Sequence, residues 1–126
     1  MEELLRYLTV THTGGRRVAL EDIHIAGQTI RAGEGIILPN ESANRDPEVF
    51  AHPNQLDLKR EGRSHVAFGF GVHLCLGQSL ARLKLQVVYG TLYRRIPAPR
   101  AAVELNQISF KHDGTVYGVH ELPVTW

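Results

Sequence analysis

The chain lacks a second cysteine, a long apolar run and any marked charge imbalance. With Cys75 as the one cysteine among 126 residues, no internal disulfide can form, and the thiol is a buried apolar side chain, a reactive group or a metal ligand. No stretch approaches the ~18 to 20 apolar residues of a membrane span, and the first residues lack the basic start and apolar run of a signal peptide. A net charge of +1 gives no overall field for nucleic acid or membrane surfaces. We therefore expect a cytoplasmic protein without a nucleic-acid or membrane partner.

Apolar spacing predicts two helices in a chain long enough to form one domain with a core. One helix runs from Glu2 to about Leu8, where leucines recur at helical spacing, and it is too short to be stable alone. The other, Gln78 to Arg95, carries two apolar rows with a polar stripe between them, which predicts burial on more than one side. Pro97 follows closely and ends this helix.

Short apolar runs broken by glycine predict small antiparallel strands between Arg17 and Leu38. From Pro39 to Arg63 the chain has no sustained period and its prolines forbid long helices, so we expect an irregular meander. The tail is expected to form short strands around a turn at His112 to Gly114. Together these elements predict an α+β fold. The apolar runs are Val18–Leu20, Ile23–Ile25 and Gln28–Ile30.

One long segment contains no acidic residue. Between Gly62 and Val103 every charged side chain is basic. Such a segment forms either a solvated basic face or a docking surface for an acidic partner, whose attraction weakens as salt rises. The basic residues are Arg63, Arg82, Lys84, Arg94, Arg95 and Arg100.

The cysteine lies in the segment Phe68–Gly77, FGFGVHLCLG, which fits few of the usual cysteine or glycine motifs. Its glycines do not have the G-x-G-x-x-G spacing of a dinucleotide site. Structural zinc needs four Cys or His ligands, typically in paired spacings, whereas here His73 and Cys75 have no second cysteine to join them. A cysteine nucleophile stays open as an alternative, but it explains neither the glycines nor the phenylalanines.

The setting of Cys75 favours a thiolate that faces a flat group. The start of a helix stabilises the anion, because unpaired N–H groups and the positive end of the helix dipole lie there. Gly69, Gly71 and Gly77 let the backbone approach something large and planar, and Phe68 can exclude water from the sulfur. An axial haem ligand needs these properties.

The same segment, continuing to Arg82, resembles the haem-binding signature of the cytochrome P450 family in its soluble bacterial form. The resemblance implies that residues 1–126 are a single partial domain, the C-terminal third of the cytochrome P450 fold. One departure is small, since Leu56 stands where the family's meander motif usually has Phe. Further motifs of the family are resembled, in the family's order, by Glu3-Leu-Leu-Arg6, Asn44–Pro47, Leu56–Arg60 and Leu122–Trp126.

The resemblance also implies roles for individual residues. Cys75 is expected to be the proximal ligand of the iron in haem b, with Phe68 shielding its sulfur. His73 and Arg17 are expected to bind the haem propionates, and Arg16 is an alternative to Arg17. The remaining expected haem-site residues are Gly69, Gly71 and Gly77, and the expected buried triad is Glu3, Arg6 and Arg60.

By the same resemblance the parent protein is a monooxygenase that inserts one oxygen atom from O2 into a small organic substrate. Its electrons come through a ferredoxin, expected on the basic proximal face. The family's domain is about three times as long, so we expect this chain to lack the central helix and most of the substrate pocket. Two pocket-lining segments are expected to remain, Val10 to Thr13 and Gly114 to Val116.

Three hypotheses follow for the 126 residues by themselves. The chain is a piece of a monooxygenase that is inactive or nearly so alone. Alternatively it is a truncated haem-binding or electron-transfer module with no monooxygenase activity. The third hypothesis is a non-enzymatic remnant that binds no haem.

Overall fold

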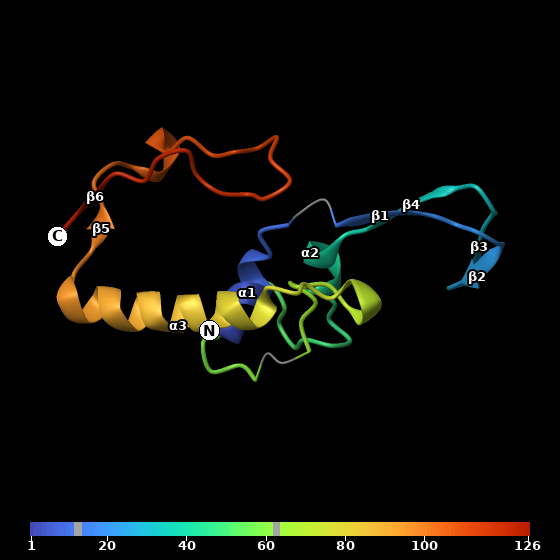
Figure 1. Ribbon diagram of the computed structural model, residues 1–126, viewed down its shortest axis with the longest axis horizontal. Coiled ribbons are helices and arrows are strands. Elements are labelled where there is room, and N and C mark those ends of the chain that lie inside the picture. The colour runs from blue at the N-terminus through green and yellow to red at the C-terminus, as the bar shows by residue number, and fades with distance from the viewer. Residues whose placement is uncertain (12–13, 62–63) are drawn as a thin grey trace.

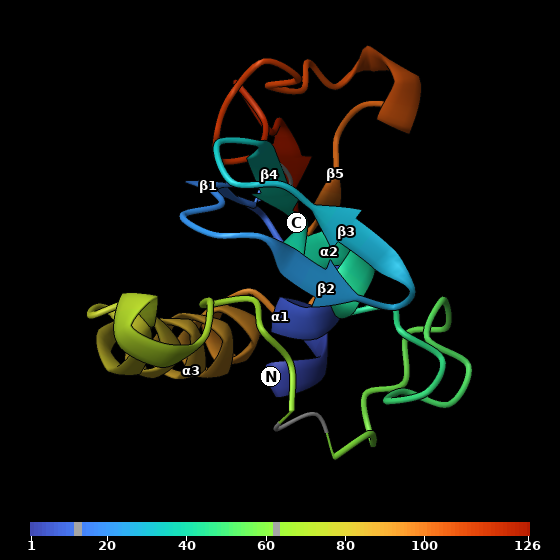
Figure 2. The same ribbon diagram turned by 90° about the vertical axis from the view of Figure 1, so that its right-hand side faces the viewer.

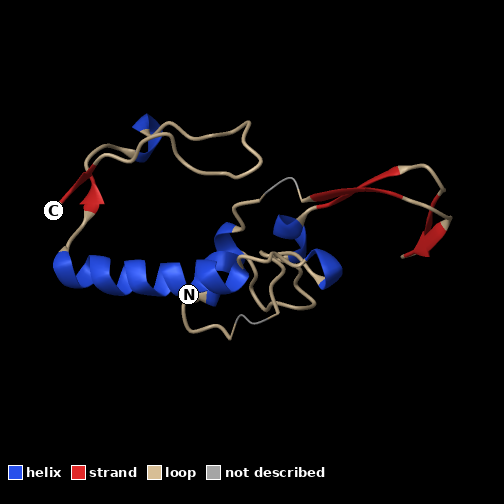
Figure 3. Cartoon of the chain, viewed as in Figure 1, coloured by secondary structure: helices blue, strands red, loops and turns tan. Residues whose placement is uncertain are grey.

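The chain forms an elongated molecule with short helices at its centre (Figure 1). The computed structural model describes residues 1–11, 14–61 and 64–126. Helices α1 (Glu2–Leu8) and α2 (Asn40–Ala43) lie centrally, beside the loop that carries the cysteine. A long helix, α3 (Gln78–Arg95), extends to one side and an arm of strands to the other. Figure 3 shows strands at both ends of the molecule and helices between them.

Both predicted helices are confirmed at the predicted bounds. Helix α3 starts after its N-cap Gly77 and ends at the C-cap Ile96, directly before Pro97. Its last turn carries Arg94 and Arg95, whose charges interact favourably with the helix dipole. The single turn α2 was not predicted, because four residues after Pro39 are too few to show a period. Two 3-10 turns, Gly71–His73 and Leu105–Gln107, complete the helical elements.

The strands of the described residues form three antiparallel pairs. Strand β1 (Gly15–Val18) pairs with β4 (Gly35–Leu38), and β2 (Ile23–Ile25) pairs with β3 (Gln28–Ile30). The turn between β2 and β3 has positive φ at both of its residues, Ala26 and Gly27, as in the type I′ turns of two-residue hairpins. Figure 2, seen from the tip of this arm, shows β2 and β3 in front of α1 and α2. The third pair joins β5 (Arg100–Ala101) to β6 (Val124–Thr125).

The predicted strand at Val18–Leu20 and the predicted strands of the tail have different outcomes. The run Val18–Leu20 is wrong as a strand, because β1 starts at Gly15 and ends at Val18. Ala19 instead exchanges backbone hydrogen bonds with the loop before β4, donating to Glu34 and accepting from Gly33. The tail does form a hairpin-like arrangement around the predicted turn, with the bridge Phe110–Val119 closing it.

The centre of the described chain is polar rather than apolar. The most deeply buried side chains are Glu3, Arg6, Thr9 and Asn44, each at most 1% exposed. Among the described residues only Ala19 and Phe50 are buried hydrophobic residues. Buried charges and amides are stable only when their hydrogen bonds are made, so the network at this centre governs the fold.

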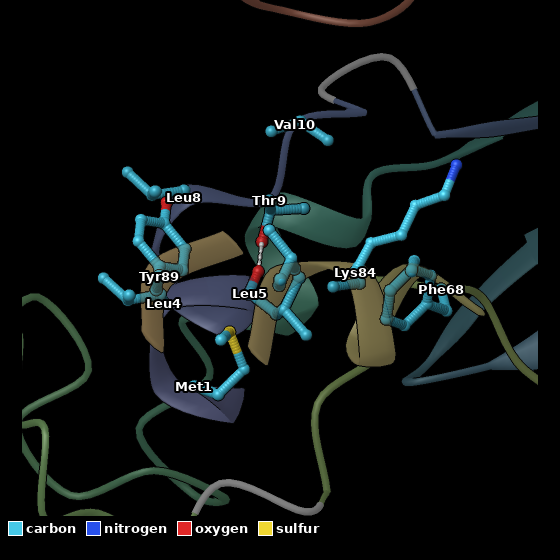
Figure 4. Close-up of a pocket in the computed structure, with 12 residues that line it drawn as sticks. Met1, Leu4, Leu5, Leu8, Thr9, Val10, Phe68, Lys84 and Tyr89 are labelled. Atoms are coloured by element: carbon cyan, nitrogen blue, oxygen red, sulfur yellow. Dashed lines mark hydrogen bonds between the residues drawn. The ribbon is translucent and has the colours of Figure 1, made fainter. Parts of the chain in front are cut away.

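Helix α3 has no buried residue among those described, which contradicts the predicted burial on more than one side. Leu83 and Val87 are 56% and 57% exposed. In the described residues α3 faces α1 across an apolar groove of about 430 Å³, so its apolar rows are not closely covered on that side. In Figure 4 side chains of both helices, among them Leu5 and Tyr89, line this groove.

Candidate functional site

The loop before α3 presents Cys75 through a short set of backbone hydrogen bonds. The N–H of Cys75 donates to the carbonyl of Phe68 at 2.9 Å, and the N–H of Leu74 donates to Gly71 at 3.0 Å. A third bond, 2.8 Å long, joins the N–H of Gly69 to the carbonyl of Val66. These bonds fold residues 68–75 into a compact turn with the cysteine at its end.

The glycines of this loop are required by backbone conformation more than by space. Gly69 and Gly71 have φ of +78° and +67°, values that side chains of L-residues rarely tolerate. A Cβ at Gly71 would meet nothing within 4 Å. At Gly77 an added Cβ would lie 3.9 Å from the Cys75 sulfur, which is ordinary contact. Positive φ therefore accounts for Gly69 and Gly71, whereas Gly77 is required neither by its φ of −82° nor by space beside the sulfur.

A cavity of about 540 Å³ opens beside the cysteine. It brings together Arg17, Phe68, Gly69, His73 and Cys75, which are up to 58 positions apart in the sequence. Gly71 and Gly77 do not line it. The other lining residues come from both predicted pocket segments, the strand arm, the start of α2 and the cysteine loop, and are Val10, Thr11, Gly14, Gly15, Leu38, Asn40, Val66, Ala67, Phe70 and Thr115.

Strand geometry separates Arg17 from its neighbour Arg16. Alternate side chains of β1 point to opposite faces, so Gly15 and Arg17 share the face that lines the cavity. Arg16 lies on the other face and is not among the lining residues. The guanidinium of Arg17 donates to the carbonyl of Arg16 at 2.8 Å. Of the two arginines, Arg17 is therefore the one in position to meet a ligand in this cavity.

The thiol of Cys75 is exposed at the cavity and is not packed among aliphatic side chains. No described amide donates a hydrogen bond to its sulfur. In the described part of the chain, no three His, Cys, Asp or Glu side chains gather into a metal-binding group. A planar prosthetic group with acidic substituents fits this donor set, because the cavity combines one thiol, two phenylalanines, an arginine and a histidine.

The predicted residues Glu3, Arg6 and Arg60 lie together, and none of them lines this cavity. The Arg6 guanidinium binds both carboxylate oxygens of Glu3, with Nε to Oε2 at 2.7 Å and Nη2 to Oε1 at 2.8 Å. Arg60 Nε lies 3.2 Å from Oε2 of the same carboxylate, within ion-pair distance but without hydrogen-bond geometry. A bidentate pair of this kind is the strong form of an arginine–carboxylate contact.

Hydrogen bonds of Glu3 and Arg6 hold the irregular meander, predicted at residues 39–63, against α1. Arg6 Nη1 donates to the carbonyls of Asn44 and Pro53 at 2.7 and 2.9 Å, and Glu3 Oε1 accepts the N–H of Asp57 at 3.0 Å. Hydrogen bonds from Arg6 lower the pKa of Glu3 from 4.5 to about 2, against the opposing effect of burial. Glu3 is thus an anion at neutral pH, and it is the carboxylate that pairs with the buried guanidinium of Arg6.

Sequence reasoning missed the buried polar pair Asn44 and Thr9. The Asn44 amide donates to the Thr9 hydroxyl at 2.8 Å and its Oδ1 accepts the N–H of Val66 at 2.7 Å. The carbonyl of Val66 in turn accepts the N–H of Gly69 in the cysteine loop. Asn44 therefore links the end of α1 to that loop through hydrogen bonds. The available signal in the sequence is the motif Asn44–Pro47, of which Asn44 is the first residue.

The basic residues of the acid-free segment do not share one environment. Arg82 pairs with Glu2 and is 30% exposed, so it is not a free cation. Arg94 and Arg95 are exposed at the far end of α3. Arg63, like His12 and Thr13 of the first pocket segment, lies outside the described residues.

The comparisons with known proteins agree with this arrangement. The cytochrome P450 family model matches residues 1–96. The chain belongs to the cytochrome P450 family. It is 56% identical over 126 residues to cytochrome P450-SU2 of Streptomyces griseolus, covering all of this chain and 31% of that protein. It is 48% identical over 126 residues to the 20-oxo-5-O-mycaminosyltylactone 23-monooxygenase of Streptomyces fradiae, covering all of this chain and 30% of that protein.

The solved structures confirm the predicted fold class, the C-terminal part of the cytochrome P450 fold. The crystal structure of cytochrome P450 MoxA from Nonomuraea recticatena superposes with a TM-score of 0.95 at 56% identity, covering 99% of this chain and 31% of that chain. The chain therefore spans about a third of the length of its P450 relatives. No helix in the described residues is long and apolar enough to cross a bilayer.

Proposed function

We propose that this chain supplies the proximal, thiolate side of a haem site in a cytochrome P450 monooxygenase, as the C-terminal third of that enzyme. The observation that supports the proposal most directly is the shared cavity of Cys75, His73 and Arg17. A haem of the b type would lie there with its iron bound by the Cys75 sulfur. When bound, that group supplies the chemistry for inserting one oxygen atom from O2 into an organic substrate.

The side chains of the protein would hold the haem by its propionates and shield the Cys75 sulfur from water. Arg17 and His73 would donate hydrogen bonds to the two propionates, and such charge-assisted bonds are the stronger kind. Phe68 would keep water from the sulfur, which favours a stable thiolate ligand. Gly69 and Gly71, through their positive φ, let the loop turn so that Cys75 faces the cavity.

Haem loading of the 126-residue chain tests this proposal. The chain is expressed with haem supplied, reduced and exposed to carbon monoxide, and we expect a strongly red-shifted, thiolate-type Soret band. A haem-bound chain with that band but no oxygenation of any substrate would be a truncated haem-binding or electron-transfer module. A folded chain that takes up no haem would contradict the proposal and leave the non-enzymatic remnant.

We also propose an acidic ferredoxin as the electron donor, fed by a reductase from NAD(P)H in the cytoplasm. Its docking surface would be the exposed basic end of α3, with Arg94 and Arg95. Because salt screens exposed charges, we expect the affinity to fall steeply between low and high ionic strength in calorimetric titrations. Arg94→Gln and Arg95→Gln should weaken binding, whereas Arg31→Gln on the strand arm should not. An affinity indifferent to salt would remove this docking surface.

A further inference from the structure

A second ion-paired cluster, separate from the triad of Glu3, lies between α1, α3 and the start of the cysteine loop. The Arg82 Nε lies 3.0 Å from each carboxylate oxygen of Glu2, and its Nη1 donates to Gln78 Oε1 at 2.7 Å. His65 Nε2 lies 3.0 Å from Glu2 Oε2, and the His65 side chain is only 1% exposed. Glu2 is thus held from two segments that lie 63 and 80 positions away in the sequence.

The hydrogen bonds of His65 fix its tautomer. Its Nδ1 accepts the backbone N–H of Ala67 at 3.2 Å, so the ring hydrogen lies on Nε2 and is donated to Glu2. Burial of the Glu2 carboxylate would raise its pKa, but the hydrogen bonds from Arg82 and His65 outweigh that effect and lower it.

This cluster meets the cysteine loop at Phe68. The Arg82 Cζ lies 4.8 Å from the centroid of the Phe68 ring, within cation–π range, and the His65 ring centroid lies 6.5 Å from it at 46°. The carbonyl of the same Phe68 accepts the N–H of Cys75 at 2.9 Å. One residue thus contacts the cluster with its ring and holds Cys75 with its backbone.

The contacts of Arg82 distinguish it from a docking residue. A docking cation needs a free, exposed guanidinium, whereas the Nε and Nη1 of Arg82 are already used within the protein. Arg94, three turns further along α3, is exposed, and its Nε donates a hydrogen bond to the carbonyl of Gly90 in its own helix. The two arginines therefore form a matched pair on one helix, and within the described residues it is Arg82 that contacts the cysteine loop.

We propose that Arg82, held by Glu2 and Gln78, is a positioning residue that fixes the Phe68 ring and through it the peptide that carries Cys75. The proposal rests on the haem-thiolate function proposed above. It predicts that loss of the Arg82 guanidinium changes the environment of Phe68 in the haem-free chain. In the haem-loaded chain it predicts a shifted reduction potential, because the surroundings of the ligand sulfur tune the iron.

The test uses the chain labelled with 4-fluorophenylalanine, which gives one fluorine signal for each of its four phenylalanines. The Phe68 signal is assigned by its loss in Phe68→Leu. In the haem-free chain we expect Arg82→Met to shift that signal, and Arg94→Met to leave it in place. Arg82→Lys keeps the charge but loses the planar guanidinium, so a shift in this variant too would favour positioning over a charge effect alone.

The haem-loaded chains give the second measurement. The midpoint potential should shift in Arg82→Met and stay unchanged in Arg94→Met. An unmoved Phe68 signal in both Arg82 variants, with circular dichroism showing α3 intact, would overturn the proposal. If Arg82→Met does not fold, Glu2→Gln provides the same test, because it removes the carboxylate charge that pairs with Arg82. An unmoved Phe68 signal in Glu2→Gln would also contradict the proposal. Failure of all chains to bind haem would remove the proposed function, while the fluorine signals would still decide the role of Arg82.

Discussion

Glu3→Gln is expected to cost about 3–5 kcal/mol of the free energy of unfolding, the cost typical of stranding one partner of a buried ion pair. The substitution keeps the size of the side chain but removes the charge that pairs with Arg6, whose side chain is 0% exposed. Arg60, 3.2 Å away, loses its anion as well. The whole free energy of unfolding of a small domain is only about 5–15 kcal/mol, so this variant should lose a large share of its stability. Urea unfolding followed by circular dichroism measures it.

Glu41→Gln is the matched control for Glu3. The Glu41 carboxylate lies 3.8 Å from Arg45 Nε and its side chain is 42% exposed, so its loss should cost less than about 1 kcal/mol. Equal costs in the two variants would show that the polar centre does not carry the fold.

The same carboxylate makes stability depend on acid pH. The pKa of Glu3 is about 2 in the folded chain against an ordinary 4.5, so its contribution is full above pH 4.5 and is lost as the pH falls towards 2. The depression corresponds to on the order of 3 kcal/mol. In Glu3→Gln this part of the pH dependence should vanish, which unfolding curves at several pH values between 5 and 2 would check.

Cys75→Ala is expected to abolish the thiolate-type Soret band of the haem-loaded chain completely. Alanine offers no ligand to the iron, so any haem still in the cavity would have a different axial ligand and a different band. Because Cys75 is exposed, we expect the substitution to change the free energy of unfolding by no more than about 0.5 kcal/mol. Circular dichroism and the reduced, carbon monoxide-treated absorption spectrum together separate loss of the ligand from loss of the fold.

Two further variants separate the iron ligand from the propionate partners. His73→Ala and Arg17→Ala should weaken haem retention while leaving the position of the band unchanged, because neither side chain is expected to touch the iron. Persistence of the thiolate-type band in Cys75→Ala would refute the assignment of the ligand. A displaced band in Arg17→Ala would instead place this arginine closer to the sulfur than its position in β1 suggests.

Local features of the chain could be predicted because they depend on neighbours in the sequence. The bounds of α3 follow from its apolar rows, from Gly77 before it and from Pro97 after it. The cysteine loop follows from glycines that need positive φ. By contrast, one turn of helix at Asn40–Ala43 is too short to leave a pattern, and the start of β1 at Gly15 shows no apolar residue.

The family, the two main helices and the cysteine segment can be inferred from the amino-acid sequence, since each is encoded in a contiguous stretch of residues. The polar centre, the place of Arg17 rather than Arg16 at the cavity, and the pairing of Arg82 with Glu2 become visible in the folded chain. The physical reason is distance along the chain. Glu2 and Arg82 are 80 positions apart, and their ion pair exists only once α1 and α3 are side by side.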